Sequence, residues 1–205
     1  MTSRTAMITI AGRPNVGKST LTNHLVGEKI AIVSNKPQTT RNRICGILTS
    51  GDTQFVFVDT PGFHKPRTKL GDYMVNVTRN SISDVDMTIL VVEPIASIGA
   101  QEQGLIDQLA SQKCPVILAI NKIDTVEKEN LLSVIDLYSK AATFDAIIPI
   151  SAKTGDGIDA LLAVCKKYAV EGPFLFPEDA TTDQPERQVM AEIIREKLLW
   201  CLERE

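Results

Sequence analysis

Short apolar runs alternate along this chain with longer segments in which apolar residues recur at helical spacing. Apolar runs of about 4–8 residues are typical of buried strands, and apolar positions three or four apart are typical of helices that pack on one face. Strands are predicted at Met7–Ala11, Met87–Val92, Val116–Ile120 and Ala146–Ile150. Helices are predicted at Ser19–Val26, Gln101–Gln112, Glu127–Lys140 and Ile158–Tyr168. The alternation predicts an α/β fold with a doubly wound, mostly parallel sheet.

One antiparallel hairpin is expected at the edge of this sheet. Two β-like runs, Ile44–Thr49 and Gln54–Val58, are separated by the turn sequence Ser50–Thr53. A short Gly-containing turn between two such runs favours a hairpin. A polar loop, Ser34–Arg43, precedes the hairpin, and a loop and helix are predicted after it at Phe63–Ser83. In doubly wound sheets ligands bind at the carboxyl ends of the strands, so the loops after those ends are the predicted site.

The tail of the chain differs from the repeating part. Gly172–Pro177 breaks the last helix, and the polar stretch that follows has the composition of a linker. From Glu186 a helix is predicted, with an apolar stripe at helical spacing made of Val189, Ile193, Ile194, Leu198 and Cys201. A stripe of this kind needs a partner surface to cover it.

Composition narrows the class of protein but does not identify it. The 205 residues are 43% hydrophobic and 23% charged with a net charge of −3, so any nucleic-acid contact must be local. No apolar run approaches the ~20 residues that span a bilayer, and the N-terminus lacks a signal-peptide core. The four cysteines, at positions 45, 114, 165 and 201, are far apart, which predicts reduced core thiols in a cytoplasmic protein. Peripheral contact with the inner face of the membrane stays open.

The loop after the first predicted strand carries a phosphate-binding pattern, Gly12–Thr20. It fits G-x-x-x-x-G-K-[ST] through Gly12, Gly17, Lys18 and Ser19. The glycines allow a tight bend around phosphate, and the following helix N-terminus adds partial positive charge. Lys18 can reach the β- and γ-phosphates, and the Ser19 hydroxyl can ligate magnesium. With a strand before it and a helix after it, the pattern predicts a nucleoside triphosphate site.

Three more strand-end loops bear on the same site. In Asp59–Gly62, the Asp59 carboxylate can hold magnesium through a water, and the Gly62 N–H can donate to the γ-phosphate. This string alone fits a plain turn equally well. After the next strand end, the Asp124 carboxylate can accept two hydrogen bonds from guanine, a donor pair that adenine lacks, and Lys122 can cover the base with its stem. Ser151–Lys153 can offer backbone N–H groups to the guanine O6, but the string is weak by itself.

Taken together, the segments GRPNVGKS, QTTRN, DTPG, NKID and SAK resemble, in order and position, those of the Era family of bacterial ribosome-assembly GTPases. The resemblance continues through FPED to ERQVMAEIIREKL, the segment that opens the KH-type RNA-binding domain of that family. It implies a GTPase domain at 1–171, a linker at 172–185 and the first helix of an incomplete KH domain at 186–205. The GXXG loop with which KH domains clamp RNA is absent from 186–205.

The resemblance also implies roles for individual residues. Three segments would bind the phosphates of the nucleotide and its metal. The first is Gly12, Arg13, Pro14, Asn15, Val16, Gly17, Lys18, Ser19 and Thr20; the second is Gln38, Thr39 and Thr40; and the third is Asp59, Thr60, Pro61 and Gly62. The base would be bound by Asn121, Lys122, Asp124, Ser151, Ala152 and Lys153. Mg²⁺ would be held by Ser19, Thr40 and Asp59, and catalysis would rest on Lys18, Thr40, Gly62 and Asn15.

The implied function is a GTP-hydrolysing switch in the maturation of 16S rRNA and the small ribosomal subunit, acting as a monomer. Phe63 stands where related enzymes place a water-orienting glutamine, so slow intrinsic hydrolysis is expected, and Asn15 implies stimulation by K⁺. Asn15 also suits a tight turn, which is the alternative interpretation of this residue. Two alternatives are a nucleotide-gated module that binds a membrane or cell-cycle partner, and an ATP-using kinase, against which Asp124 argues.

Overall fold

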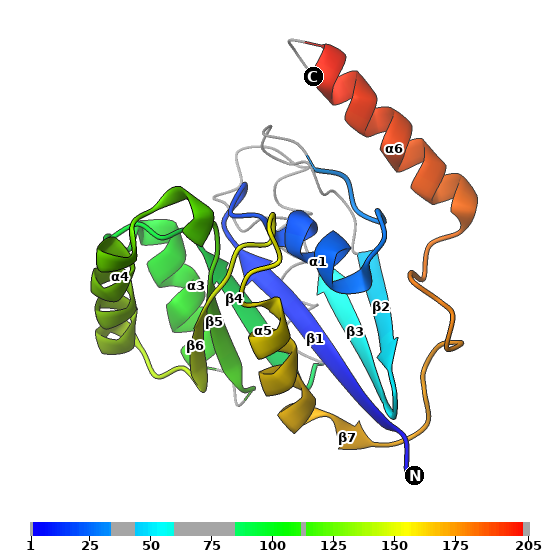
Figure 1. Ribbon diagram of the computed structural model, residues 1–205, viewed down its shortest axis with the longest axis horizontal. Coiled ribbons are helices and arrows are strands. Elements are labelled where there is room, and N and C mark those ends of the chain that lie inside the picture. The colour runs from blue at the N-terminus through cyan, green and yellow to red at the C-terminus, as the bar shows by residue number, and fades with distance from the viewer. Residues whose placement is uncertain (1, 34–43, 60–84, 112–113, 203–205) are drawn as a thin grey trace.

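The computed structural model describes residues 2–33, 44–59, 85–111 and 114–202. Predictions for Gln38, Thr39, Thr40, Thr60–Gly62 and the helix at Phe63–Ser83 therefore lie outside the described residues. The described strands form one sheet in the order β2-β3-β1-β4-β5-β6, with β7 paired to β1 (Figure 1). Their bounds are β1 Arg4–Gly12, β2 Ile44–Ser50, β3 Thr53–Asp59, β4 Met87–Val92, β5 Val116–Ile120, β6 Ala146–Pro149 and β7 Val170–Glu171.

The predicted fold class is confirmed. β3, β1, β4, β5 and β6 are parallel neighbours, and β2 is antiparallel to β3 at the edge of the sheet. The helices α1 (Lys18–Val26) and α5 (Ile158–Cys165) cover one face, and α3 (Ala100–Ala110) and α4 (Lys128–Ala141) cover the other (Figure 1). Adjacent residues of β4 serve opposite faces: Ile89 packs under α1 and α5, and Leu90 packs under α3 and α4. The central strands are therefore mostly apolar, and the exceptions within them include the buried Thr9 of β1 and Thr88 of β4.

Two details at the end of the GTPase-like unit differ from the sequence prediction. The last helix ends at Cys165 and gives way to a 3₁₀ turn, Lys166–Tyr168, so the predicted end at Tyr168 is wrong by that one turn. A short strand, β7, then pairs with Arg4 and Thr5 of β1. Two residues are too short a run to carry an alternation, so the sequence pattern gave no sign of this strand.

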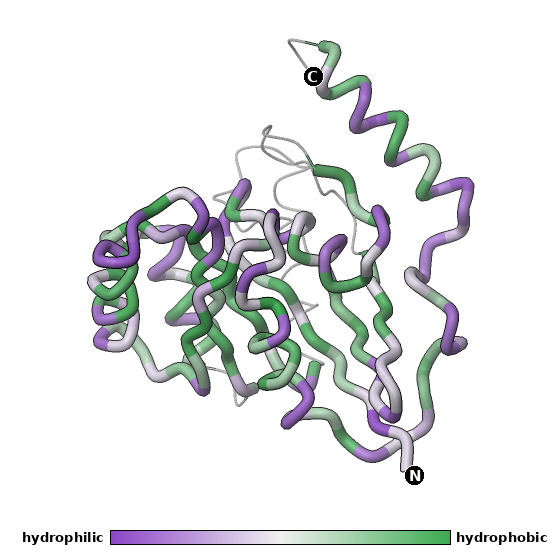
Figure 2. Tube along the Cα trace, viewed as in Figure 1, coloured by the Kyte–Doolittle hydropathy of each residue, from purple (hydrophilic) through white to green (hydrophobic). Residues whose placement is uncertain are grey.

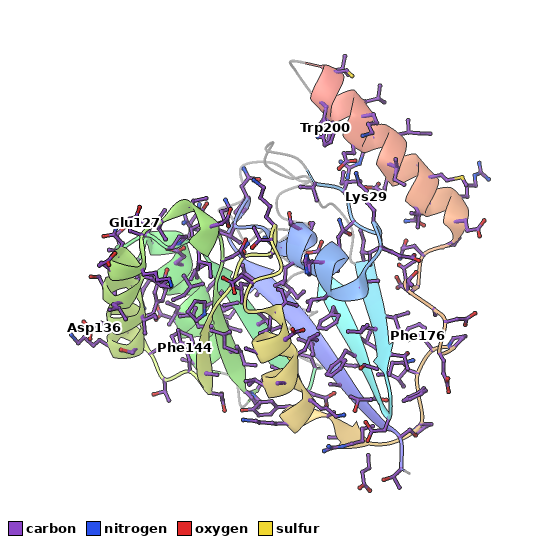
Figure 3. The ribbon with its side chains drawn as sticks, viewed as in Figure 1. Lys29, Glu127, Asp136, Phe144, Phe176 and Trp200 are labelled. Carbon is purple, nitrogen blue, oxygen red and sulfur yellow. The ribbon has the colours of Figure 1, made fainter. Side chains whose placement is uncertain are left out.

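The segment predicted as a linker lies against the hairpin. The Ile47 N–H donates to the Thr181 carbonyl at 2.9 Å, which pairs the open edge of β2. The buried Gln54 side chain accepts hydrogen bonds from the N–H groups of Leu175 and Phe176, at 2.9 and 3.0 Å. The Phe176 ring packs on the hairpin near Val56 (Figure 3). The segment therefore covers an edge strand that would otherwise expose unpaired backbone groups.

The last helix, α6 (Glu186–Cys201), docks on the segment that follows α1. The carboxylate of Glu196, fully buried, forms an ion pair with Lys29 and accepts the Val33 N–H at 3.0 Å. The Trp200 indole donates to the Val33 carbonyl at 3.2 Å, and Lys29 lies over its ring (Figure 3). These contacts fasten α6 to Lys29 and Val33, at the end of the described segment 2–33.

The apolar residues of α6 are not gathered on the face that docks. Of the predicted stripe, Ile194, Leu198 and Cys201 are exposed, and Val189 and Ile193 are half-buried. The buried Leu199 lies outside the stripe, and the hydropathy varies along the whole helix (Figure 2). The predicted stripe is thus mostly uncovered within the described residues, because the contacts with the segment after α1 are polar and aromatic.

The cysteine prediction is partly wrong. All four cysteines lie in the described residues as free thiols, and Cys45 and Cys165 are buried as expected. Burial raises the pKa of the Cys165 thiol to about 12, which keeps it protonated and unreactive. Cys114 is half-buried, and Cys201, the last residue of α6, is exposed. Among the described helices, none has the length and apolar character needed to cross a membrane.

Candidate functional site

The carboxyl ends of five neighbouring strands bring the predicted loops to one edge of the sheet. The β1–β3 register sets Ile10 beside Asp59, and the β5–β6 register sets Ile120 beside Pro149. β4 lies between β1 and β5, with Val92 beside Ile120. Loops that are remote in sequence are therefore neighbours in space, as the parallel topology requires.

The phosphate-binding loop depends on close backbone approaches that only glycine permits. A Cβ atom at Gly12 would lie 2.5 Å from the Val91 carbonyl oxygen, and one at Gly17 would lie 2.2 Å from the side-chain amide nitrogen of Asn121. Gly17 has φ 101°, and Asn15 has φ 65°, a left-handed conformation that asparagine tolerates better than most residues. α1 begins directly afterwards at Lys18, so its N-terminal dipole faces the loop.

Lys18 is folded back into this loop. Its ammonium donates to the carbonyl oxygens of Arg13 at 2.7 Å and Gly12 at 3.1 Å, and the side chain is buried. Burial lowers the pKa of Lys18 to about 8, and the nearby Asp59 carboxylate partly opposes that shift. A negatively charged group held in the loop would favour the ammonium form, so Lys18 is suited to bind an anion there.

Oxygen atoms that can ligate a magnesium ion lie close to Lys18. The Ser19 hydroxyl donates to the Asp59 carboxylate at 2.8 Å, and Asp59 is fully buried at the end of β3. A hydroxyl and a carboxylate are hard oxygen ligands, which Mg²⁺ prefers together with phosphate oxygens and waters. These two predicted metal-site residues therefore fit the ion. Thr40, the third, lies outside the described residues.

Asn121 joins two loops of the site with its side chain. Its amide nitrogen donates to the Val16 carbonyl at 2.8 Å, and its amide oxygen accepts the Ala152 N–H at 2.9 Å. Asn121 is 2% exposed, so both contacts are shielded from water. The family resemblance implies that Asn121 and Ala152 bind the base. In this structure their polar atoms fasten the third predicted loop to the first and fourth.

Lys122 and Asp124, both predicted to bind the base, are held by different partners. Lys122 has φ 66° and donates from its ammonium to the Asn15 carbonyl at 2.8 Å. Asp124 is exposed, and its carboxylate accepts the Ser151 hydroxyl hydrogen bond at 2.7 Å, which fixes its orientation. The Ser151 hydroxyl in turn accepts the Thr154 N–H at 3.2 Å. An oriented, accessible carboxylate is what recognition of a paired donor edge requires.

Similarity to known proteins identifies the family of this chain. A family model described as a 50S ribosome-binding GTPase matches residues 7–122. The GTPase Era of Ruminiclostridium cellulolyticum is 52% identical over the whole chain, which spans 69% of that protein. The chain belongs to the Era family of GTPases. It is accordingly a GTP-hydrolysing enzyme.

Solved Era structures superpose on nearly all of the chain. A crystal structure of Era with MgGDPNP and nucleotides 1506–1542 of 16S ribosomal RNA has a TM-score of 0.93 at 36% identity, over 99% of this chain and 69% of that one. An Aquifex aeolicus Era variant bound to GDP and AlF4⁻ has a TM-score of 0.92 at 36% identity, over 98% of this chain and 69% of that one.

The Era-type loops are joined by residues that the sequence analysis did not select. Glu93, directly after β4, lies between Lys122 and Arg13, and Glu102 in the first turn of α3 accepts a hydrogen bond from Arg13 at 2.8 Å. The loop after β4 was missing from the predicted site because it carries no motif. One signal was present: a carboxylate directly follows the apolar run Met87–Val92, at the end of the strand where ligands bind.

Proposed function

We propose that the four strand-end loops hold GTP with Mg²⁺ at a single site, the phosphates in Gly12–Thr20 and the guanine between Lys122, Asp124 and Ser151–Lys153. The observation that carries this proposal is the convergence of Lys18, Asp59 and Asp124 on one edge of the sheet, each with a fixed orientation. Mg²⁺ would neutralise phosphate charge there, with Ser19 and Asp59 as its protein-side oxygen groups. Gln38, Thr39, Thr40 and Thr60–Gly62 belong to the proposed site by sequence.

The residues of the loop would act on charge that develops in the transition state. The Lys18 ammonium, already held inside the loop, is placed to stabilise negative charge as the γ-phosphoryl group leaves. Phe63 follows Gly62 and cannot orient a water by hydrogen bonding. We therefore infer slow hydrolysis by the isolated protein, on the order of 10⁻⁴ s⁻¹.

We further propose that this GTPase acts in the assembly of the small ribosomal subunit and contacts 16S rRNA. Support comes from the Era–16S rRNA crystal structure, which matches 99% of this chain, α6 included. The residues from Glu186 onward would open the KH-type domain, joined by the segment 172–185 to the GTPase domain at 1–171. Because α6 is fastened at Val33, the RNA-binding part would be attached a few residues along the chain before the QTTRN segment, Gln38–Asn42, which by the family resemblance would be the first switch of the GTPase.

Recovery with ribosomal subunits tests this role. We expect the tagged protein, isolated from its source cells, to bring down small subunits in the presence of a non-hydrolysable GTP analogue, and to bring down fewer with GDP. Large subunits from the same lysate provide the internal comparison. Equal recovery of both subunits, or no small subunits with either nucleotide, would contradict the proposal.

Potassium is expected to accelerate hydrolysis through Asn15. If the side chain helps to hold K⁺ beside the phosphates, single-turnover rates should be about tenfold higher in KCl than in NaCl of equal concentration. The Asn15→Gly variant keeps the left-handed backbone of φ 65° and removes only the side chain. We expect it to hydrolyse GTP equally slowly in both salts. A potassium effect that survives in Asn15→Gly would show that asparagine serves the turn and not the ion.

A further inference from the structure

Glu93 lies at the carboxyl end of β4, between two loops of the proposed site. These are the phosphate loop, Gly12–Thr20, and the base loop, Asn121–Asp124. Glu93 follows β4, which pairs with β1 on one side and β5 on the other. The register places Val91 beside Gly12, at the start of the phosphate loop, and Val92 beside Ile120, at the start of the base loop. The Asn121 N–H also donates to the Val92 carbonyl at 2.8 Å. A side chain at position 93 therefore extends between the two loops.

The two oxygens of the Glu93 carboxylate face different cations. One is 2.5 Å from the Lys122 ammonium, and the other is 3.6 Å from the Arg13 guanidinium. Lys122 belongs to the base loop and Arg13 to the phosphate loop, so a single carboxylate holds a residue of each. Glu93 is half-buried, with 26% of its side chain exposed, which weakens screening by water without removing it.

Both cations are held from a second side as well. The Lys122 ammonium also donates to the Asn15 carbonyl at 2.8 Å, and the Arg13 guanidinium donates to Glu102 at 2.8 Å. Glu102 is buried, and its carboxylate caps the start of α3 through the Gly99 N–H at 3.2 Å. Two carboxylates and two cations thus balance in charge, and the network ends on a rigid helix. Such a network fixes geometry more than an isolated surface pair does.

We propose that Glu93 is a positioning residue for nucleotide binding: it holds the Lys122 stem where the guanine plane will lie and ties that lysine to the phosphate loop. This inference rests on the proposed nucleotide site. Lys122 has a flexible four-carbon stem, and ordering it before the nucleotide arrives removes an entropic cost from binding. Without the carboxylate, the ammonium keeps only the Asn15 carbonyl as a described partner, and the stem gains freedom.

A double-mutant cycle on GDP affinity tests the proposal. Glu93→Gln keeps the size of the side chain but removes its charge, and we expect GDP to bind about tenfold more weakly. Lys122→Met removes the ammonium and keeps an apolar stem. If Glu93 acts through Lys122, adding Glu93→Gln to Lys122→Met should change GDP affinity by less than about twofold. Glu171→Gln, an exposed glutamate on β7, serves as the matched control.

The outcomes separate this inference from the site on which it rests. Wild-type GDP affinity in Glu93→Gln would overturn the positioning role and leave the proposed site standing. A full tenfold loss in the Lys122→Met background would also overturn it, because Glu93 would then act independently of Lys122. Unchanged affinity in Lys122→Met alone would overturn the base contact and the inference with it. Urea unfolding of Glu93→Gln, expected to match Glu171→Gln, distinguishes positioning from a general loss of stability.

Discussion

Replacement of Asp124 with asparagine is expected to weaken GDP binding about 10³-fold and to make xanthosine diphosphate the better ligand. In the proposed site the carboxylate would accept two hydrogen bonds, from the N1 and N2 donors of guanine, and an amide nitrogen in place of one carboxylate oxygen would face a donor instead. Xanthine carries an oxygen in place of the guanine amino group, so the same amide nitrogen can donate to it. The Ser151 hydroxyl at 2.7 Å can still donate to the remaining amide oxygen, so the local fold should persist.

Isothermal titration with both nucleotides is the measurement. Asp136→Asn, at an exposed position on α4, is the matched control and should bind GDP as the wild type does. The decisive feature is the reversal between GDP and xanthosine diphosphate, because simple unfolding would weaken both. If Asp124→Asn lost affinity for both nucleotides in parallel, the assignment of this carboxylate to the purine edge would be wrong.

Replacement of Asn121 with alanine is expected to lower the free energy of unfolding by about 2–4 kcal/mol. The change leaves the Val16 carbonyl and the Ala152 N–H without the partner that they have at 2.8 and 2.9 Å, in surroundings where Asn121 itself is 2% exposed. Each buried polar group that loses its partner costs about 1–3 kcal/mol. The phosphate loop and the base loop also lose their link, so GDP affinity should fall together with stability.

Chemical denaturation monitored by circular dichroism, with and without GDP, measures both effects. Asn130→Ala replaces an exposed asparagine on α4 and should change the free energy of unfolding by less than about 0.5 kcal/mol. If Asn121→Ala were as stable as Asn130→Ala but bound GDP poorly, Asn121 would contact the base directly and would not serve as a structural link between the loops.

The sequence pattern located the fold because the rules that govern it are local. The buried strands were recognisable as apolar runs, since both faces of the sheet are covered, and β4 and β5 were each predicted with both ends correct. The phosphate loop was recognisable because Gly12 and Gly17 meet steric limits that leave little choice of residue. Strand ends shifted by one to three residues elsewhere, for example at β1, where pairing with β3 extends the strand back to Arg4.

The sequence by itself determined the order of the elements and the functional groups available at each strand end. It also determined the resemblance to the Era GTPases, because all of these follow from residue types at fixed spacings. Only the tertiary structure decided how the loops are fastened to one another. Asn121 links Val16 to Ala152 and Glu93 lies between Arg13 and Lys122, and these partners are up to 105 residues apart along the chain. No pattern of neighbouring residues encodes such pairs, since they arise from strand order and register across the sheet.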